Sequence, residues 1–359
     1  MNKYRVAQVG CGARGEIHLD GWLKNGDRFD VKAVCDLDQE KAHRVVKARN
    51  LPAKVYADAD KMLADIKPDV FCFSTLPNVR LSMVELAVKH QVKALVFEKP
   101  MATSLSEALK ITELCRRHKI LAAVSHQQKY LTSFAKLKSV LDAGEIGKLQ
   151  RIDVSCQAWL AQLGTHYIDY ILWANGGKRA KWVVGHAHGK ELLANHHPSP
   201  NFTMGQIGLE NGVRAIVQFG KLSPSYMGKD DFWKDNRLTA YGTHGYVWCD
   251  TDGRWGTFNR TTHGEMITAE GERWEIQQRK LQEFFAKDLA HWLDDGAKVH
   301  PCNIDITYHG YEILEALCLS AMEYRRVDLP LKQSDPYDMF ARMRKDLPEC
   351  PELPPENSR

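Results

Sequence analysis

Short runs of β-branched and apolar residues alternate with amphipathic segments through the first third of the chain. Five runs predict β-strands, at residues 4–9, 31–35, 70–73, 94–97 and 121–124. Three segments between them carry apolar residues at three- and four-residue spacings, which predicts helices packed on a sheet at 39–49, 79–90 and 105–118. Alternating strands and helices are typical of βαβ units, so this region is predicted to form a parallel sheet.

The pattern changes after residue 125. A helix is predicted at 134–141, a strand at 149–159 and a helix at 164–173, and then strands predominate, at 182–184, 202–209, 213–219, 237–241 and 246–248. Turn residues such as Glu210-Asn211-Gly212 between them indicate antiparallel hairpins. Two closing helices, 278–293 and 304–325, precede a Pro-rich end, 347–359, expected to be extended or disordered.

These elements predict an α/β chain with two folded domains. An N-terminal Rossmann domain covers residues 1–124, and an α+β domain with a large, mostly antiparallel sheet covers 125–335. Residues 336–359 are assigned to a C-terminal tail. A chain of 359 residues exceeds the size at which one hydrophobic core keeps growing, which also favours two domains.

Composition excludes several classes of protein. A 44% hydrophobic and 26% charged content is that of a folded globular protein, and a net charge of +4, scattered along the chain, argues against a nucleic-acid partner. No apolar stretch has the length of a membrane span, and the N-terminus does not resemble a secretion signal. The nine cysteines are expected to be reduced, several within apolar runs, so we predict a cytoplasmic protein.

A glycine-rich motif, Gly10-Cys11-Gly12-Ala13-Arg14-Gly15, follows the first strand directly and precedes a helix. The first glycine permits a tight turn, the second lets the backbone approach a pyrophosphate, and the third allows close packing of helix and sheet. The helix N-terminus supplies N–H groups for phosphates. In this context the motif predicts a dinucleotide cofactor.

Asp36 ends the second strand, where a carboxylate accepts hydrogen bonds from the adenosine ribose hydroxyls and repels a 2′-phosphate. The cofactor is therefore predicted to be NAD. The alternative role, capping the next helix, suits Asp38 better. Arg14 is an argument against NAD specificity, because a guanidinium near the ribose can tolerate the 2′-phosphate of NADP.

The tripeptide Glu98-Lys99-Pro100 follows the strand at 94–97, at the sheet edge where doubly wound folds bind ligands. A lysine shielded from water there has a lowered pKa, suited to proton exchange with a hydroxyl. Pro100 is a candidate for a cis peptide bond. By pattern alone, a surface lysine before a turn is the commoner interpretation.

The order and approximate spacing of five motifs resemble the glucose-fructose oxidoreductase/inositol dehydrogenase family over nearly the whole chain. The motifs are the glycine-rich turn, Asp36, Ser74-Thr75-Leu76-Pro77-Asn78, Glu98-Lys99-Pro100 and Gly164-Thr165-His166-Tyr167-Ile168-Asp169. The resemblance implies that NAD is lined by Gly10, Gly12, Ala13, Arg14, Asp36, Ser74, Thr75, Pro77, Asn78, Glu98 and Lys99. It further implies that Lys99 and His166 are catalytic, and that the sheet of the second domain makes dimers or tetramers.

Three positions depart from the family pattern. Gln162 replaces an aspartate four residues before His166, so it can orient a substrate but cannot accept a proton. Leu81 stands where the family often has histidine, and Gln127-Gln128-Lys129 replaces a segment that commonly reads asparagine, any residue, arginine. Gln127 is therefore predicted as a cofactor contact, and Gln162 as a substrate contact.

Histidine pairs, aromatic residues and one long loop are further candidates for ligand contacts. His186-Ala187-His188 and His196-His197 suggest a metal, but no carboxylate or cysteine stands at ligand spacing, and we predict no metal site. Aromatic rings stack on sugars, and Trp159 is taken as a substrate contact from a set that also includes Tyr130, Tyr167, Tyr226 and Trp233. The segment 223–236 is the expected specificity loop or subunit contact.

Three functions fit the sequence. The first is an NAD-dependent dehydrogenase that moves a hydride to or from a ring hydroxyl of a sugar, glycoside or cyclic polyol. The second is a redox-neutral enzyme in which NAD transiently oxidises the ring, a glycosidic bond is eliminated, and NAD is regenerated. The third is an NAD-sensing protein that has lost catalysis, against which the intact lysine motif argues.

Overall fold

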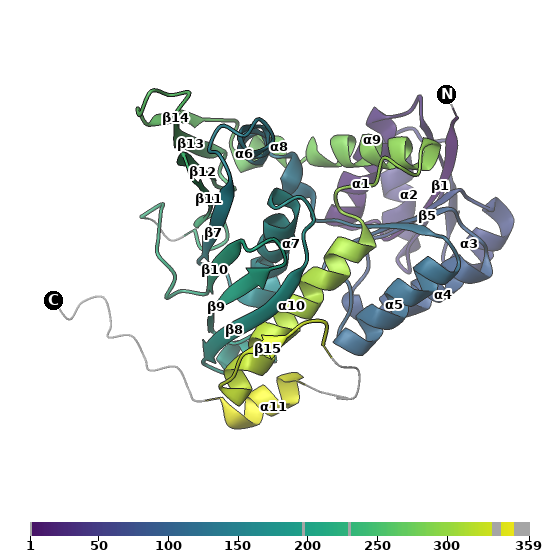
Figure 1. Cartoon of the computed structure of the whole chain (residues 1–359). Helices are drawn as coiled ribbons and strands as arrows, with labels where there is room; N and C mark the ends of the chain where they lie inside the picture. Colours follow the sequence, from purple (N-terminus) through teal and green to yellow (C-terminus); the bar gives the residue numbers. More distant parts are fainter. Residues whose placement is uncertain (1, 196–197, 229–230, 332–338, 348–359) are drawn as a thin grey trace. The chain divides into compact units, whose positions relative to one another are not determined.

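The structure, a computed structural model, describes residues 2–195, 198–228, 231–331 and 339–347. It divides into two compact units (Figure 1). Unit 1 comprises Met1–Thr132 and Glu272–His309, and unit 2 comprises Ser133–Gly271 and Gly310–Arg359. Each unit is built on its own β-sheet.

Unit 1 contains a six-stranded parallel sheet of the Rossmann type, with strand order β3-β2-β1-β4-β5-β6. Its strands are β1 (Tyr4–Val9), β2 (Phe29–Cys35), β3 (Lys54–Tyr56), β4 (Val70–Phe73), β5 (Ala94–Phe97) and β6 (Leu121–Val124). The helices between them are α1 (Ala13–Lys24), α2 (Gln39–Ala48), α3 (Ala59–Ile66), α4 (Arg80–Lys89) and α5 (Leu105–Arg117). The predicted Rossmann fold is confirmed, and only β3 and α3 were absent from the prediction.

Unit 2 contains a nine-stranded sheet in the order β14-β13-β12-β11-β7-β10-β9-β8-β15. The strands are β7 (Leu149–Cys156), β8 (Ala180–His188), β9 (Phe202–Leu209), β10 (Arg214–Phe219), β11 (Asn236–Gly242), β12 (Gly245–Cys249), β13 (Arg254–Asn259), β14 (Ile267–Glu270) and β15 (Val327–Asp328). Only the pairing of β7 with β10 is parallel. The predicted mostly antiparallel sheet is confirmed.

Two helices cover one face of this sheet, α7 (Thr165–Ala174) and α10 (Ile304–Glu323) (Figure 1). The close approach of α10 requires glycine on the strands, because a Cβ at Gly185 would lie 2.2 Å from the carbonyl oxygen of Leu317. A Cβ at Gly205 would lie 2.5 Å from the Leu317 side chain. In the sequence, α6 (Thr132–Asp142) precedes the first strand of this sheet, β7.

The two units differ from the predicted linear boundaries, because residues 272–309 pack with the Rossmann sheet. This segment contains α8 (Trp274–Gln277) and α9 (Leu281–Asp294), and α9 lies beside α1 (Figure 1). Phe285 and Leu289 of α9 share one buried apolar cluster with Leu19 and Trp22 of α1. Burial of these side chains favours the association by roughly 1.5–3 kcal/mol for each large residue.

The predicted tail contains a helix. Residues Met339–Asp346 form α11, on which Met339 and Met343 are buried, whereas residues 348–359 lie outside the described part of the chain. Among the described residues, no helix is long and apolar enough to cross a membrane.

Gly21 is expected to be essential for the packing of α1 on α9. A Cβ at this position would lie 2.7 Å from the carbonyl oxygen of Gln282 and 2.8 Å from its carbonyl carbon. In an exposed helix, replacing glycine by alanine typically stabilises by about 0.5–1 kcal/mol. Here we expect Gly21→Ala to lower the free energy of unfolding measured by urea denaturation, since backbone atoms must move.

The control is Gly296→Ala, because a Cβ at Gly296 meets no described atom within 4 Å. A Gly21→Ala variant as stable as the parent, or more stable, would contradict the packing argument.

Candidate functional site

The glycine-rich turn between β1 and α1 has the geometry that the sequence predicted. Gly10 has a φ of +91°, and a Cβ there would lie 2.6 Å from the carbonyl oxygen of Ser74. A Cβ on Gly15 would lie 2.0 Å from the carbonyl oxygen of Gly10. At Gly12, the N-cap of α1, no described atom comes within 4 Å of a Cβ position. The turn is therefore packed on two sides and open where a pyrophosphate would approach.

The turn lies between the ends of β2 and β4, the neighbours of β1 in the sheet. The Asp36 carboxylate, at the end of β2, accepts hydrogen bonds from the backbone N–H of Cys11 at 2.7 Å and from that of Asp38 at 3.0 Å. Asp38 caps α2 by accepting from the N–H of Lys41 at 3.0 Å, as the sequence predicted. Asp36 is thus fixed beside the glycine-rich turn, with capacity for further hydrogen bonds.

Two hydroxyl groups follow β4 on the other side of the turn. Ser74 Oγ and Thr75 Oγ1 are buried and have no hydrogen-bond partner among the described residues. Buried polar atoms are normally hydrogen-bonded, so this pair is suited to a polar ligand. Pro77 and Asn78 begin η1 (Pro77–Val79) one residue further on, after Leu76. Together with the open glycine turn, these hydroxyls fit a dinucleotide.

Sequence reasoning missed two exposed leucines at this edge. Leu37, after Asp36, has 94% of its surface exposed, and Leu76, after Thr75, has 72%. Large apolar side chains are usually more buried, so both indicate an apolar contact surface. The available signal was their position, immediately after the polar residues at the ends of two neighbouring strands.

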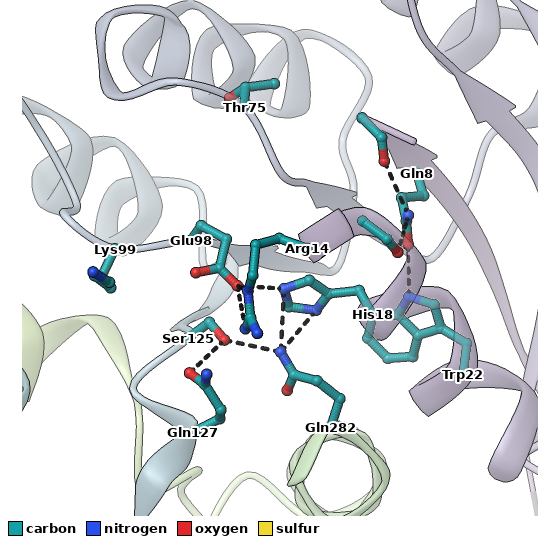
Figure 2. A network of polar contacts seen from close by, with 12 residues as sticks. Gln8, Arg14, His18, Trp22, Thr75, Glu98, Lys99, Ser125, Gln127 and Gln282 are labelled. Atoms are coloured by element: carbon teal, nitrogen blue, oxygen red, sulfur yellow. Dashed lines mark hydrogen bonds and ion pairs between the residues drawn. The ribbon is translucent and has the colours of Figure 1, made fainter. Parts of the chain in front are cut away.

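A network of hydrogen bonds lies at the ends of β5 and β6 (Figure 2). Arg14 donates to Glu98 Oε1 from Nη2 at 2.8 Å and from Nε at 3.1 Å, and His18 Nε2 lies 2.9 Å from the same oxygen. Burial by itself would raise the pKa of Glu98, but the charge of Arg14 and the hydrogen bond from His18 hold that pKa well below its usual range. Glu98 is therefore ionised, and Arg14 is directed to it.

Gln127 belongs to the same network. With its amide oriented to satisfy its neighbours, its oxygen accepts from Arg14 Nη2 at 3.0 Å and its nitrogen donates to the Ser125 carbonyl at 2.7 Å. The residue is buried at the start of η2 (Gln127–Tyr130). Gln127 thus contacts Arg14 of the glycine-rich motif.

Lys99 follows Glu98 after the end of β5. The buried Arg80 donates from Nη2 to the carbonyl oxygens of Lys99, at 3.2 Å, and of Thr75, at 3.3 Å. Burial lowers the pKa of Lys99 to about 8, the negative charge of Glu98 opposes this shift, and Arg14 and Arg80 add to it. The Lys99–Pro100 bond is cis, as predicted. An amine of this pKa can exchange a proton near neutral pH.

Unit 2 holds the second group of predicted residues. His166, buried at the start of α7, has its Nδ1 2.8 Å from the hydroxyl of Tyr170. Gln162 lies in the preceding η3 (Leu160–Gly164), and its N–H donates to the carbonyl of Trp159 at 3.0 Å. These three predicted residues therefore come from one continuous segment.

Among the predicted aromatic residues, Trp159 is half-buried and lies against a ring of the 223–236 segment. Its ring stacks on that of Phe232, with 5.7 Å between centroids and an interplanar angle of 9°. Tyr167, in contrast, is fully buried and bonded through its hydroxyl to Asn236 and Thr251, so it is a core residue. Phe232 lies on the 223–236 segment, of which residues 229–230 lie outside the described chain.

The predicted residues thus form two groups. Unit 1 brings together the glycine turn, Asp36, Ser74, Glu98 and Lys99, with their neighbours, whereas unit 2 contains the His166 group. Among the described residues, no group of three or more His, Cys, Asp or Glu side chains could hold a metal ion, and His196-His197 lies outside them.

Comparison with known proteins supports the Rossmann fold and the cofactor predicted for unit 1. Residues 4–126 match the model of the Gfo/Idh/MocA group, described as an oxidoreductase family with an NAD-binding Rossmann fold. Over these residues the chain is similar to the NAD-binding domain of that family. The resemblance found in the sequence is therefore confirmed, and NAD is the cofactor of its Rossmann domain.

Curated relatives are similar over part of their length. Inositol 2-dehydrogenase of Burkholderia lata is 28% identical over 226 residues, which cover 60% of this chain and 66% of that protein. D-apiose dehydrogenase of Rhizobium rhizogenes is 28% identical over 148 residues, 41% of this chain and 42% of that protein. The chain thus spans less than two thirds of the length of these relatives.

Solved structures share the fold over a longer range. A levoglucosan dehydrogenase in complex with NADH and L-sorbose has a TM-score of 0.78 and 15% identity, covering 92% of this chain and 100% of that one. An oxidoreductase from Agrobacterium radiobacter, in complex with NAD⁺, L-tartaric acid and magnesium, has a TM-score of 0.76 and 19% identity, covering 91% and 98%. At these identities the likeness shows the fold alone, which the chain shares with these structures.

Proposed function

We propose that this protein is an NAD-dependent dehydrogenase that transfers a hydride between nicotinamide and a ring hydroxyl of a sugar, glycoside or cyclic polyol. The observation that carries the proposal is Lys99, a half-buried lysine that follows Glu98 at the end of β5 and has its pKa lowered to about 8. The names of its relatives, inositol 2-dehydrogenase and D-apiose dehydrogenase, support a polyol or sugar substrate.

The residues of unit 1 divide the binding of NAD among them. The N–H groups at the glycine turn and the start of α1 take the pyrophosphate, and Asp36 takes the adenosine ribose hydroxyls. Leu37 and Leu76 cover the adenine. Ser74, Thr75, Pro77, Asn78 and Gln127 line the remaining length, with Glu98 and Arg14 at the nicotinamide end.

Bound NAD⁺ supplies the hydride acceptor. Lys99 Nζ, in its neutral form, removes the hydroxyl proton as the hydride leaves the adjoining carbon, and returns it in the reverse reaction. We assign His166 to the same substrate, as a second group that holds or moves a proton. Gln162 orients the ring through its amide, and Trp159 offers an aromatic face to it.

The test is a substrate screen on the purified full chain. We expect net NADH formation with some member of a panel of inositols, pentoses, pyranoses and glycosides. Cleavage of a glycoside with unchanged total NADH would replace the proposal with the redox-neutral reaction. Tight NAD binding with no turnover across the panel would favour an NAD-sensing protein.

We also propose that the enzyme is a cytoplasmic homo-oligomer. Cys72 and Cys156 are packed as small apolar groups in the cores of their units, which suits a reducing compartment. On the sheet of unit 2, Val184 and Met204 remain exposed and offer an apolar surface to a second copy. Light scattering during gel filtration is expected to give a dimer or tetramer.

Asp36 is expected to make NAD bind more tightly than NADP. The carboxylate is fixed by the N–H groups of Cys11 and Asp38, and Arg14 is directed to Glu98, so a 2′-phosphate would meet a negative charge. Asp36→Ser should narrow the difference in the Kd values, measured by titration at constant salt. Asp30→Ser, a change at the start of the same strand, is the control. A parent protein that prefers NADP would show that Asp36 is wrongly assigned.

A further inference from the structure

The hydrogen bonds around Glu98 form a closed ring within unit 1, and two members of it have no assigned role. One is His18, from the middle of α1, and the other is Gln282, from the first turn of α9. Both are buried, with about 2% of their surface exposed. Figure 2 shows His18 between Gln282 and the Arg14–Glu98 pair.

Gln282 connects the two halves of the ring. Its Nε2 lies 3.2 Å from both ring nitrogens of His18 and donates to Ser125 Oγ at 2.9 Å. Gln127, in the amide orientation given above, donates to Ser125 Oγ at 3.2 Å and accepts from Arg14. The side chains of α1, of α9 and of the segments after β5 and β6 therefore hold one another in place.

The donors and acceptors around His18 define its protonation. Glu98 accepts from Arg14 and is ionised, so the His18 Nε2 that faces it must carry a proton. The amide Nε2 of Gln282 lies 3.2 Å from both ring nitrogens. Because His18 Nε2 directs its proton to Glu98, Nδ1 is the ring nitrogen that can accept from the amide. Burial lowers the pKa of His18, against the opposing effect of Glu98, which agrees with a neutral Nε2–H tautomer.

Glu98, the hydrogen-bond partner of His18 Nε2, immediately precedes Lys99 in the sequence. The charged groups of unit 1 that act on the lysine amine include Glu98 after β5, Arg14 from α1 and Arg80 from α4. Glu98 and Arg14 belong to the ring, and the charge of Glu98 opposes the effect of burial on the pKa of Lys99. Displacing the Glu98 carboxylate would therefore make Lys99 easier to deprotonate.

We propose that His18 and Gln282 are positioning residues for Lys99, which hold the Glu98 carboxylate against Arg14 as a fixed negative charge next to the lysine. Gln282 fixes the tautomer of His18, and His18 fixes Glu98. The link to catalysis rests on the proposed dehydrogenase function, whereas the arrangement itself does not. Neither residue contacts the substrate in this proposal.

The arrangement is tested by titration of Lys99 without any assay of turnover. In protein with ¹³C-labelled lysine, the Lys99 signal is identified by its loss in Lys99→Met, and its midpoint is followed by NMR. We expect Glu98→Gln to lower the midpoint, and His18→Leu, which removes both ring nitrogens, to lower it in the same direction. His18→Gln retains an amide donor toward Glu98 and should restore the parent midpoint. His43→Gln, at an exposed position of α2, is the control.

Gln282 is tested by the tautomer of His18. With ¹⁵N-labelled histidine, the parent should show His18 as the neutral Nε2–H form throughout the titration. Gln282→Glu places a carboxylate opposite Nδ1, so His18 should become doubly protonated, while Gln282→Met should leave it neutral. A parent His18 that titrates near its ordinary pKa of about 6.5 would overturn the inference.

The same variants separate this inference from the proposed function. A hydrogen bond to a charged group corresponds to roughly a ten- to hundredfold change in an equilibrium, so we expect His18→Leu to lower kcat by about tenfold. The acidic limb of its kcat/KM profile should move with the Lys99 midpoint. If the midpoint moves and the limb does not, the proposed role of Lys99 is wrong and the network stands. An unchanged midpoint in His18→Leu, with Glu98→Gln shifted, removes His18 from the positioning of Glu98.

Discussion

Lys99→Met is expected to lower kcat for oxidation of the hydroxyl by about 10²- to 10⁴-fold, the usual contribution of a general acid-base group. Methionine has a similar length and fits a buried position, so the fold should be retained. NAD affinity should stay within several-fold, because the proposal assigns the phosphates and riboses of NAD to other residues. Steady-state kinetics together with an NAD titration measure both effects.

Lys93→Met is the matched control for this experiment. Lys93 precedes the same strand whose end carries Lys99, and its side chain is 64% exposed, paired with Asp69 at 2.9 Å. Exposed ion pairs contribute at most about 1 kcal/mol, so kcat should be unaffected. A Lys99→Met enzyme with nearly normal kcat would remove Lys99 from the mechanism. Small primary amines added to Lys99→Ala should restore part of the rate.

The pH profile gives an independent measure of the same group. Because burial lowers the pKa of Lys99 to about 8, the neutral amine needed as a base disappears as the pH falls below that value. For the oxidation, kcat/KM should therefore rise with pH and level off above about 8. This limb should be absent in Lys99→Met.

Local patterns were sufficient for most elements of unit 1. The strands Val70–Phe73, Ala94–Phe97 and Leu121–Val124 were predicted at their observed bounds, because each is an apolar run with polar or turn residues after it. The strand Lys54–Tyr56 was missed, since three residues with one lysine show no periodicity. This strand forms through its parallel pairing with β2, which the local sequence pattern does not indicate.

Long-range contacts could not be predicted in this way. The amphipathic pattern of α9 indicates a helix, but not that Phe285 packs against the α1 side of the Rossmann sheet. The same limit applies to the site: Asp36 and Glu98 follow from motifs, whereas Gln282 meets His18 across 264 positions of sequence. A histidine within α1 reads as a core residue until its partner, Glu98, is known.

The second large effect is expected in unit 2, where His166→Ala should lower kcat severely, by about 10²- to 10⁴-fold for a proton-transferring group. The imidazole is buried, and its Nδ1 lies 2.8 Å from the Tyr170 hydroxyl, which fixes the orientation of the ring. His186→Ala, at an exposed position of β8, is the control and should be fully active. A fully active His166→Ala enzyme would overturn the assignment of the histidine.

Gln162 provides the contrast, because it stands where the family usually has an aspartate and an amide does not take up a proton at neutral pH. We therefore expect Gln162→Ala to raise KM with little change in kcat, as for a hydrogen bond made equally in the ground and transition states. Gln162→Asp should add an ionisation to the pH profile, since it restores a titrating group four residues before His166. Equal losses of kcat in Gln162→Ala and His166→Ala would instead place the amide on the proton path, acting through a bound water.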